Sequence, residues 1–235
     1  MQGRIHRAIC THFVVNPSLT FCALKFNLLV IPVLYFCITL MEKDINHIVD
    51  EIFGLYEAYG SEDYIGEPVS QIEHMSQAAQ LAIDEGFEDE VVLAAFFHDI
   101  GHLCATKTAA NSMNGYGVIS HEKIGSDYLK EKGLPTLVLQ LVENHVRAKR
   151  YLTYKFPYYY ESLSEASKKT LEFQGGVMGV AEAEVFEKDP LFQTSIRMRQ
   201  WDELAKQINV PIVDLEEIKA KATSVLRNSA SPATF

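Results

Sequence analysis

The chain has 235 residues, with 21 Lys and Arg against 31 Asp and Glu, which gives a formal net charge of −10 at pH 7. This charge, without any basic block, disfavours a protein that binds nucleic acid mainly through the phosphate backbone, although a few converging cations could still bind a small anion. The four cysteines include no CxxC pair, which excludes a thiolate zinc ribbon and disfavours a disulfide-stapled fold.

Residues 1–40 differ from the remainder of the chain, because they contain three basic residues and no acidic residue, and the run 26–40 is apolar and uncharged. Three interpretations remain open: a cleaved signal peptide, a single-pass membrane anchor over 19–40, or an extension that is not part of the functional protein. We favour the last, which would leave the protein in the cytoplasm. We expect one functional domain over 41–235.

Beyond Met41 the hydrophobic periodicity is helical almost everywhere, and the alternation typical of strands is weak. A capping box of Ser70 and Glu73 predicts the start of the second helix, and the uniformly apolar run 91–97 predicts a buried central helix. We expect helices over 43–59, 70–85, 88–99, 119–131, 136–147, 164–173, 179–188, 192–207 and 212–226. The predicted fold class is therefore all-α, a single helical bundle. The loops expected at the rim of a site are 103–118, 148–163 and 174–178.

Five of the eight histidines lie within the periodic part of the chain, namely His74, His98, His102, His121 and His145. Four of them are on or beside apolar helices, where an unpaired imidazole is costly to bury. The strongest local motif is His98 with Asp99 at the end of the buried helix, because a divalent metal would supply the charge that allows both to be buried. A His–Asp dipeptide alone more often reflects hydrogen-bonded core residues. Histidines on successive helices, followed by Asp202, favour a metal site.

The pattern of His74, His98-Asp99, His121, His145 and Asp202 resembles the HD-domain superfamily, in its expanded form that binds two metals. The resemblance implies a helical bundle in which Asp99 bridges the metals. It implies that His74, His98 and Asp202 complete one metal site, and that His121 and His145 hold the second. Ordinary members are phosphohydrolases, whereas another branch consists of mixed-valent di-iron oxygenases.

Residues outside the metal motif are similar to the phosphonate-cleaving members of that second branch, the 2-amino-1-hydroxyethylphosphonate dioxygenases. Tyr64 and Glu67 precede His74 in a Gly- and Pro-containing segment. In that family the tyrosine covers the open iron position and the glutamate binds the substrate's amino group. His102, three residues after Asp99, is assigned to the same catalytic set. The substrate contacts implied by the resemblance are Lys149, Ser167, Gln174 and Arg199.

The resemblance therefore implies a dioxygenase of organophosphonate catabolism that holds two iron ions as Fe(II)/Fe(III). Imidazole and carboxylate are ligands that iron accepts, and the net positive centre would attract an anion. The substrate would be a 1-hydroxy-2-aminoethylphosphonate, cleaved with O₂ at the C–P bond to phosphate and glycine, or to an N-substituted glycine. The sequence does not distinguish a primary amine from a trimethylammonium group.

The alternative is a metal-dependent HD phosphohydrolase that acts on a nucleotide or another phosphate ester. It would use the same six ligands but would give no role to Tyr64 and Glu67 as a pair. For the oxygenase, the implied partners are a small anionic substrate and O₂, without nucleic acid. Membrane contact is expected only if 19–40 is an anchor.

Overall fold

The computed structural model describes residues 44–64, 66–105 and 112–230. The predicted extension over 1–40, with its possible anchor at 19–40, lies outside these residues, as does part of the predicted loop 103–118. None of the described helices combines the length and the apolar character that crossing a membrane requires.

The described residues form helices joined by turns, and their extended pairing is limited to two isolated bridges, Asp63 with Ser70 and Ser112 with Val118. This confirms the all-α prediction. The first helix spans 44–59. The others are α2 (Gln71–Asp84), α3 (Asp89–Phe97), α4 (Gly101–Cys104), α5 (His121–Glu131), α6 (Thr136–Lys155), α7 (Pro157–Ser162), α8 (Glu165–Phe173), α9 (Val180–Phe186), α10 (Phe192–Leu204) and α11 (Leu215–Ala230).

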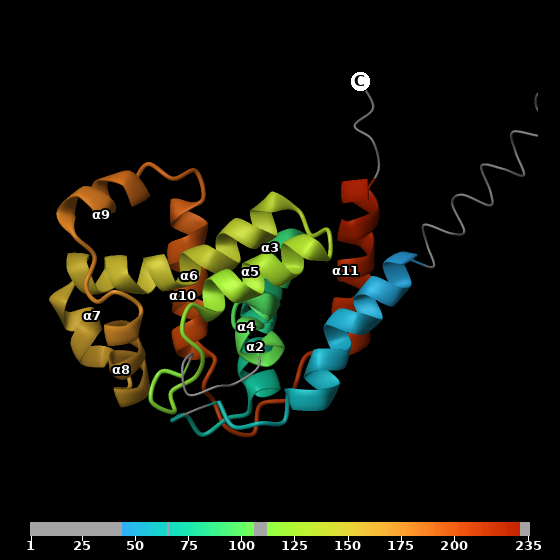
Figure 1. Cartoon of the computed structure of the whole chain (residues 1–235), viewed down its shortest axis with the longest axis horizontal. Helices are drawn as coiled ribbons and strands as arrows, with labels where there is room; N and C mark the ends of the chain where they lie inside the picture. The colour runs from blue at the N-terminus through green and yellow to red at the C-terminus, as the bar shows by residue number, and fades with distance from the viewer. Residues whose placement is uncertain (1–43, 65, 106–111, 231–235) are drawn as a thin grey trace, which may run out of the picture. The chain divides into compact units, whose positions relative to one another are not determined.

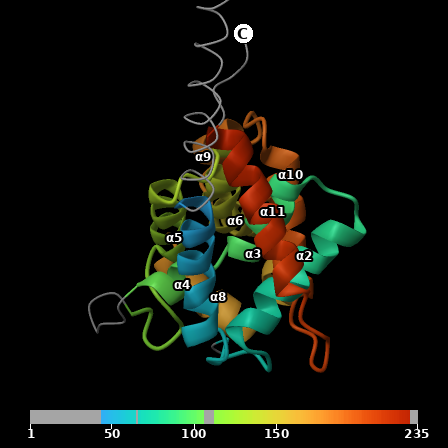
Figure 2. The ribbon, with the colours of Figure 1, turned by 90° about the vertical axis from the view of Figure 1, so that its right-hand side faces the viewer.

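Helix α3 lies in the middle of the bundle, surrounded by the longer helices (Figures 1 and 2). Its residues from Val91 to Phe97 are all buried, which confirms the prediction made from the uniformly apolar run. The main core packs against them from the helix over 44–59 and from α2, α6, α10 and α11. Burial of aromatic side chains such as Phe53 and Trp201 supplies much of the hydrophobic stabilisation of this core. The central position of α3 fixes His98 and Asp99, which follow it directly.

The predicted capping box at the start of α2 is present. The Ser70 hydroxyl accepts from the backbone N–H of Glu73, and the backbone N–H of Ser70 donates to the Glu73 carboxylate at 2.7 Å. These reciprocal bonds satisfy two otherwise unpaired donors at the helix end. Because His74 follows Glu73 directly, the cap also sets the position at which this imidazole enters the bundle.

The predicted end of α6 was wrong. The helix does not stop at residue 147 but continues to Lys155, and α7 occupies much of the remaining predicted loop. A loop at the rim of the site was expected from residue 148, yet Tyr151 and Leu152 pack against Met178, Ala183 and Phe186 in a second, smaller core. The helix ends where Pro157 restricts the preceding residue to an extended conformation. Lys149 therefore lies on a helix and not in a loop.

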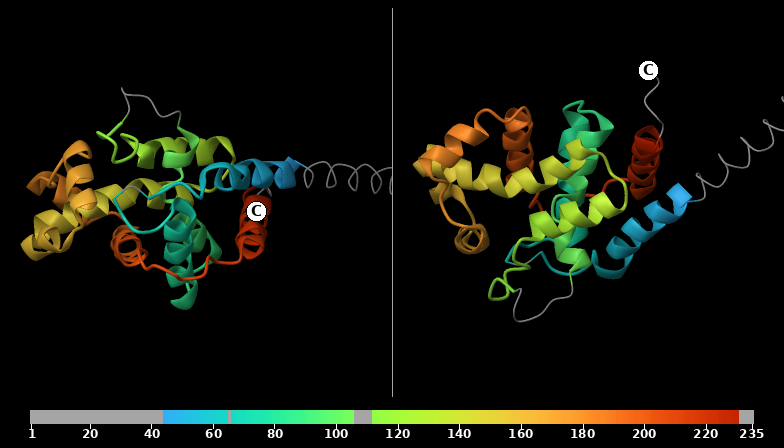
Figure 3. Two further views of the ribbon diagram at one scale, coloured as in Figure 1. Left: turned by 90° about the horizontal axis from the view of Figure 1, so that it is seen from below. Right: turned by 45° about the horizontal axis from the view of Figure 1, so that its top comes forward.

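The first and last described helices lie side by side, as both Figure 1 and Figure 3 show. The Lys219 ammonium of α11 lies 5.7 Å from the ring centroid of Phe53 on the helix over 44–59. Helices α7, α8 and α9 gather at the other end of the bundle. The described residues from Ile45 to Ala230 belong to one compact unit, and its core draws on both ends of this stretch.

We expect a chain that starts at Met41 to fold, bind metal and retain activity, because the core described above is built from residues beyond 44. Size-exclusion chromatography and metal analysis of this shortened chain, beside the full chain, would check this. If the shortened chain aggregates while the full chain is soluble without detergent, the extension 1–40 contributes to the fold.

Candidate functional site

Four histidines from four different helices meet at the centre of the bundle. His74 is carried by α2, His98 follows α3, His121 begins α5, and His145 lies within α6. Each is 3% exposed or less. With Asp99 they form two groups that could each hold a metal ion, one of His74, His98 and Asp99 and the other of Asp99, His121 and His145.

Each of these imidazoles is oriented by a backbone carbonyl that lies within hydrogen-bonding distance of its Nδ1. The partners are Ala205 O for His74 (2.8 Å), Ala95 O for His98 (2.8 Å), Val118 O for His121 (3.3 Å) and Val142 O for His145 (2.6 Å). A carbonyl can only accept, so the hydrogen lies on Nδ1 and the Nε2 lone pair is directed to the centre of the site. This is the arrangement by which proteins orient histidine ligands of metals.

The Nε2 atoms face one another in two pairs. The distance between them is 3.1 Å for His74 with His98 and again 3.1 Å for His121 with His145. Because each Nδ1 already carries a hydrogen, two lone pairs would meet at this distance unless a proton or a metal lies between them. Both pairs therefore require a cation.

The Asp99 carboxylate lies between the two pairs and directs one oxygen to each. Its Oδ2 is 3.3 Å from His98 Nε2 and 3.6 Å from His74 Nε2. Its Oδ1 is 3.1 Å from His121 Nε2 and 3.4 Å from His145 Nε2. This is the position of a carboxylate that can bridge two metals.

Asp202 from α10 adds a second carboxylate on the side of His74. Its Oδ1 lies 3.5 Å from His74 Nε2 and, among the described residues, is buried without a hydrogen-bond partner. A buried carboxylate oxygen without a donor is costly, and a metal beside His74 would satisfy it. The predicted set of four imidazoles and two carboxylates thus fits metal binding.

The pKa values of His74 and His98 also indicate that a cation is bound at this site. Burial lowers the pKa of His74 to about 4, which keeps this imidazole neutral. Burial alone would lower the pKa of His98 too, but the Asp99 carboxylate raises it to about 9. Without a metal, a proton is therefore bound on His98, in the place where a metal would supply the positive charge.

Tyr64 and Glu67 both line the pocket beside the two groups of ligands. The Tyr64 ring stacks on His74 with 3.9 Å between ring centroids and 12° between planes. Burial raises the pKa of Tyr64 well above its usual range, and the Asp99 and Asp202 carboxylates add to this, so its hydroxyl is protonated. Tyr64 thus packs against the candidate ligand His74 as a neutral phenol.

His102 stacks on His121 with 4.1 Å between ring centroids, as part of the pocket wall. Its Nδ1 accepts the backbone N–H of Val118 at 3.1 Å, which leaves the hydrogen of the neutral ring on Nε2. Burial lowers the pKa of His102 well below its usual range, so the ring remains a neutral donor. A Cβ on Gly117 would lie 2.7 Å from the His102 ring, so a glycine is needed for this close approach.

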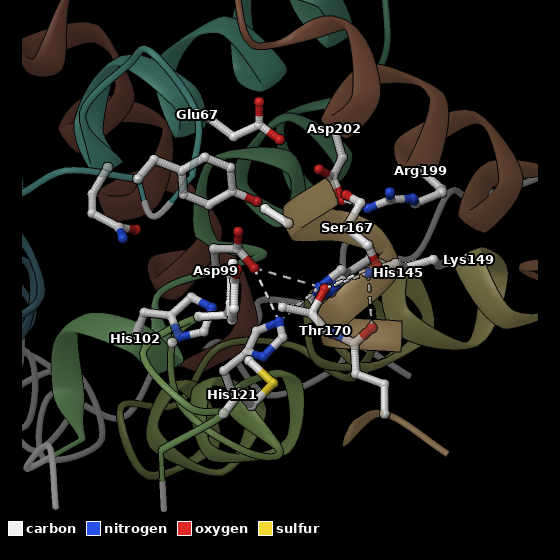
Figure 4. A pocket seen from close by; sticks show the side chains of 17 residues that line it. Glu67, Asp99, His102, His121, His145, Lys149, Ser167, Thr170, Arg199 and Asp202 are labelled. Carbon is white, nitrogen blue, oxygen red and sulfur yellow. Dashed lines mark hydrogen bonds and ion pairs between the residues drawn. The ribbon is translucent and has the colours of Figure 1, made fainter. Parts of the chain in front are cut away.

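Lys149 is only 3% exposed and projects from α6 towards α8, as Figure 4 shows together with the rest of the pocket. Its ammonium donates to Thr170 Oγ1 at 2.7 Å and to Gln174 Oε1 at 3.0 Å, and neither partner is charged. Burial lowers the pKa of Lys149 well below its usual range. A buried cation with neutral partners is a favourable place for an anion to bind.

Ser167, Thr170 and Gln174 form one polar side of the same pocket. Ser167 and Gln174 were predicted from the sequence as substrate contacts, whereas Thr170 was not. Thr170 lies three residues after Ser167 and four before Gln174, a spacing that places all three on one helical face. That spacing was the signal that could have identified it.

Arg199 lines the pocket, but its guanidinium is already occupied by protein groups. It forms ion pairs with Asp202 and Glu203, and its Nε donates to the Tyr159 hydroxyl at 2.8 Å. Although burial raises the pKa of Asp202, the charge of Arg199 lowers it. In this structure Arg199 therefore orients a candidate metal ligand.

The chain is similar in sequence to one described protein family and to several known proteins. Residues 72–172 match the family described as HD domain. An uncharacterized protein of Acanthamoeba polyphaga mimivirus is 44% identical over 176 residues, which cover 75% of this chain and 80% of the relative.

Two further relatives have names that state an activity. The 1-hydroxy-2-(trimethylamino)ethylphosphonate dioxygenase (glycine-betaine-forming) of Leisingera caerulea is 38% identical over 72% of this chain and 85% of its own length. The hydroxymethylphosphonate dioxygenase of Gimesia maris is 34% identical over 77% of this chain and 89% of its own length.

Proposed function

The chain belongs to the HD-domain dioxygenases, and we propose that it uses two irons and O₂ to cleave the carbon–phosphorus bond of a 1-hydroxyphosphonate. The resemblance inferred from the sequence is confirmed by these relatives, and both named activities are dioxygenases rather than the phosphohydrolase considered as an alternative. The observation that carries the proposal is Asp99, whose two carboxylate oxygens each face one pair of imidazoles. Imidazole and carboxylate suit iron.

In this proposal different residues of the pocket bind the phosphonate, cover the metal site and donate a hydrogen bond. Lys149, with Thr170 and Ser167 beside it, binds the phosphonate oxygens. Tyr64 covers the metal site until substrate arrives, and His102 offers its Nε2–H as a neutral donor at the pocket wall. The bound irons would supply O₂ reduction and removal of the hydrogen from C1.

The reaction is balanced by one O₂ for each substrate. The C–P bond breaks, C1 becomes a carboxylate and the phosphonate leaves as phosphate, with one oxygen atom added to each product. We propose a 1-hydroxy-2-aminoethylphosphonate-type substrate, which would give glycine or an N-substituted glycine. In support, Figure 4 shows Glu67 on a different side of the pocket from Lys149, so that the two ends of such a substrate would meet opposite charges.

The proposal can be tested on protein loaded with iron in the absence of O₂. Electron paramagnetic resonance should show a coupled di-iron signal that changes when the hydroxyphosphonate is added, and phosphate should appear only after O₂ is admitted. Phosphate release from a phosphate ester without O₂, supported equally by manganese, would instead identify a phosphohydrolase.

Glu67→Ala should weaken binding of 1-hydroxy-2-aminoethylphosphonate and leave the metal in place, because this side chain contacts none of the candidate ligands in the structure. A charge-assisted hydrogen bond contributes roughly 1.5–3 kcal/mol, so the loss should be about tenfold or more. The loss should be smaller for hydroxymethylphosphonate, which lacks the amine. Equal losses for both substrates in phosphate-release assays would contradict a role in binding the amine.

A further inference from the structure

Lys206, which follows α10, forms an ion pair with Glu67, the residue that we propose binds the substrate's amine. Its Nζ lies 3.0 Å from Glu67 Oε1, and the two side chains are only 12% and 10% exposed. The same oxygen accepts the Ser164 hydroxyl at 2.5 Å. Glu67 is therefore not a free anion at the edge of the pocket, because a primary ammonium of the protein already neutralises it.

Lys206 has a second carboxylate within reach. Its Nζ lies 3.5 Å from Glu203 Oε2, one helical turn earlier in the chain. A lysine between two carboxylates can give up one without losing its counter-charge, because the four-carbon stem is flexible and the ammonium has three donors. Release of Glu67 by Lys206 therefore does not leave an unpaired buried cation.

The pocket also places this ion pair where the far end of a substrate would lie. Glu67 lines the pocket, whereas Lys206 approaches it from the segment after α10 and is not part of the lining. A substrate whose phosphonate binds at Lys149 would extend its other end towards Glu67 (Figure 4). An ammonium at that end would be a second cation competing for Glu67.

We propose that Lys206 is a specificity-determining residue that occupies, in the resting protein, the position of the substrate's ammonium on Glu67. The arriving ammonium takes the place of Lys206 on Oε1, and Lys206 stays with Glu203. This inference rests on the proposed phosphonate substrate. It predicts that Lys206 lowers the affinity for aminated phosphonates, because each must displace an ion pair, and does not lower the affinity for phosphonates without an amine.

The test compares two phosphonates, 1-hydroxy-2-aminoethylphosphonate and hydroxymethylphosphonate, on the full iron-loaded chain. Dissociation constants are measured by calorimetry without O₂, and turnover is measured as phosphate release after O₂ is admitted. Lys206→Met removes the charge at nearly constant length, and Lys206→Gln is a second neutral variant in case the first does not fold. Lys206→Arg keeps the charge and serves as the matched control.

For both neutral variants we expect affinity for the aminated phosphonate to rise about tenfold relative to the amine-free one, the scale of one charge-assisted hydrogen bond. Lys206→Arg should leave this ratio within about threefold of the wild type, since it retains the cation. If the affinity for the aminated phosphonate relative to the amine-free one stays unchanged or falls in the neutral variants, the proposal is overturned. Lys206 would then only hold Glu67 in position, or would contact the phosphonate group that both ligands share.

The two proposals fail in different ways. If the wild-type protein binds both phosphonates but cleaves neither with O₂, the proposed function is wrong, and the ratio of affinities still decides the role of Lys206. If it binds neither phosphonate, both proposals are overturned.

Discussion

Replacing Asp99 with alanine should remove both metals from the protein and abolish turnover. Each carboxylate oxygen faces one pair of imidazoles, so a single substitution takes a ligand from both metal positions. A second consequence follows from the loss of negative charge: the pKa of His98 should fall from about 9, because Asp99 is what raises it against the effect of burial. Metal content by mass spectrometry would check the loss, which should be from two irons per chain to almost none.

Asp127→Ala is a matched control, because Asp127 has an exposed side chain and pairs with Lys123 on the surface of α5. This variant should keep both irons. Asp99→Asn tests the charge separately from the shape, since it preserves the side-chain volume while removing the ionised bridge. Two irons retained in Asp99→Ala would contradict the assignment of the bridge, and one iron retained would assign Asp99 to a single metal.

The candidate metal ligands were identified in the sequence by their resemblance to the HD-domain pattern, and the structure brings their side chains together. Local pattern supports the burial of three of them, because His74 follows a capping box and His98 with Asp99 follows an apolar run. His102 is different, because it lies on α4, a short helix that was not predicted. The helices that carry His74, His121 and His145 were predicted from hydrophobic periodicity.

The surroundings of the ligands could not be predicted in the same way, because they depend on contacts between distant segments. The pairing of Lys206 with Glu67 spans 139 residues, and neither charge differs in sequence from an ordinary solvated one. The burial of Lys149 was missed for a related reason. Its helix was predicted to end at residue 147, which left Lys149 in a loop at the rim of the site. Arg199 is an intermediate case, since its pairing with Asp202 follows the i,i+3 spacing of one helix.

Lys149→Met should weaken phosphonate binding and at the same time stabilise the substrate-free protein. The ammonium is buried with two neutral partners, Thr170 and Gln174, so its charge favours a bound anion. Its removal should cost about ten- to a hundredfold in affinity, corresponding to roughly 1.5–3 kcal/mol. Lys155→Met is the matched control on the same helix, because Lys155 is exposed and pairs with Glu187. This control should change neither affinity nor turnover.

The gain in stability has a definite dependence on pH. Burial lowers the pKa of Lys149 in the folded protein below the value of 10.5 expected in the unfolded chain. The unfolded chain therefore binds the proton more tightly, and the folded wild type loses stability as the pH falls below 10.5. The difference in unfolding free energy between Lys149→Met and the wild type should be largest at low pH and should shrink as the pH rises towards 10.5.

Binding should change with pH in a related way, since the phosphonate binds the protonated amine of Lys149. The affinity advantage of the wild type over Lys149→Met should be present below the lowered pKa of this group and should be lost as the pH rises through it. The phosphonate's own titration affects both proteins equally, so it cancels in the ratio of their dissociation constants. A ratio of one at every pH, together with unchanged turnover, would show that Lys149 is a structural residue. The anion would then be bound by the metals and by the polar side of the pocket formed by Ser167, Thr170 and Gln174.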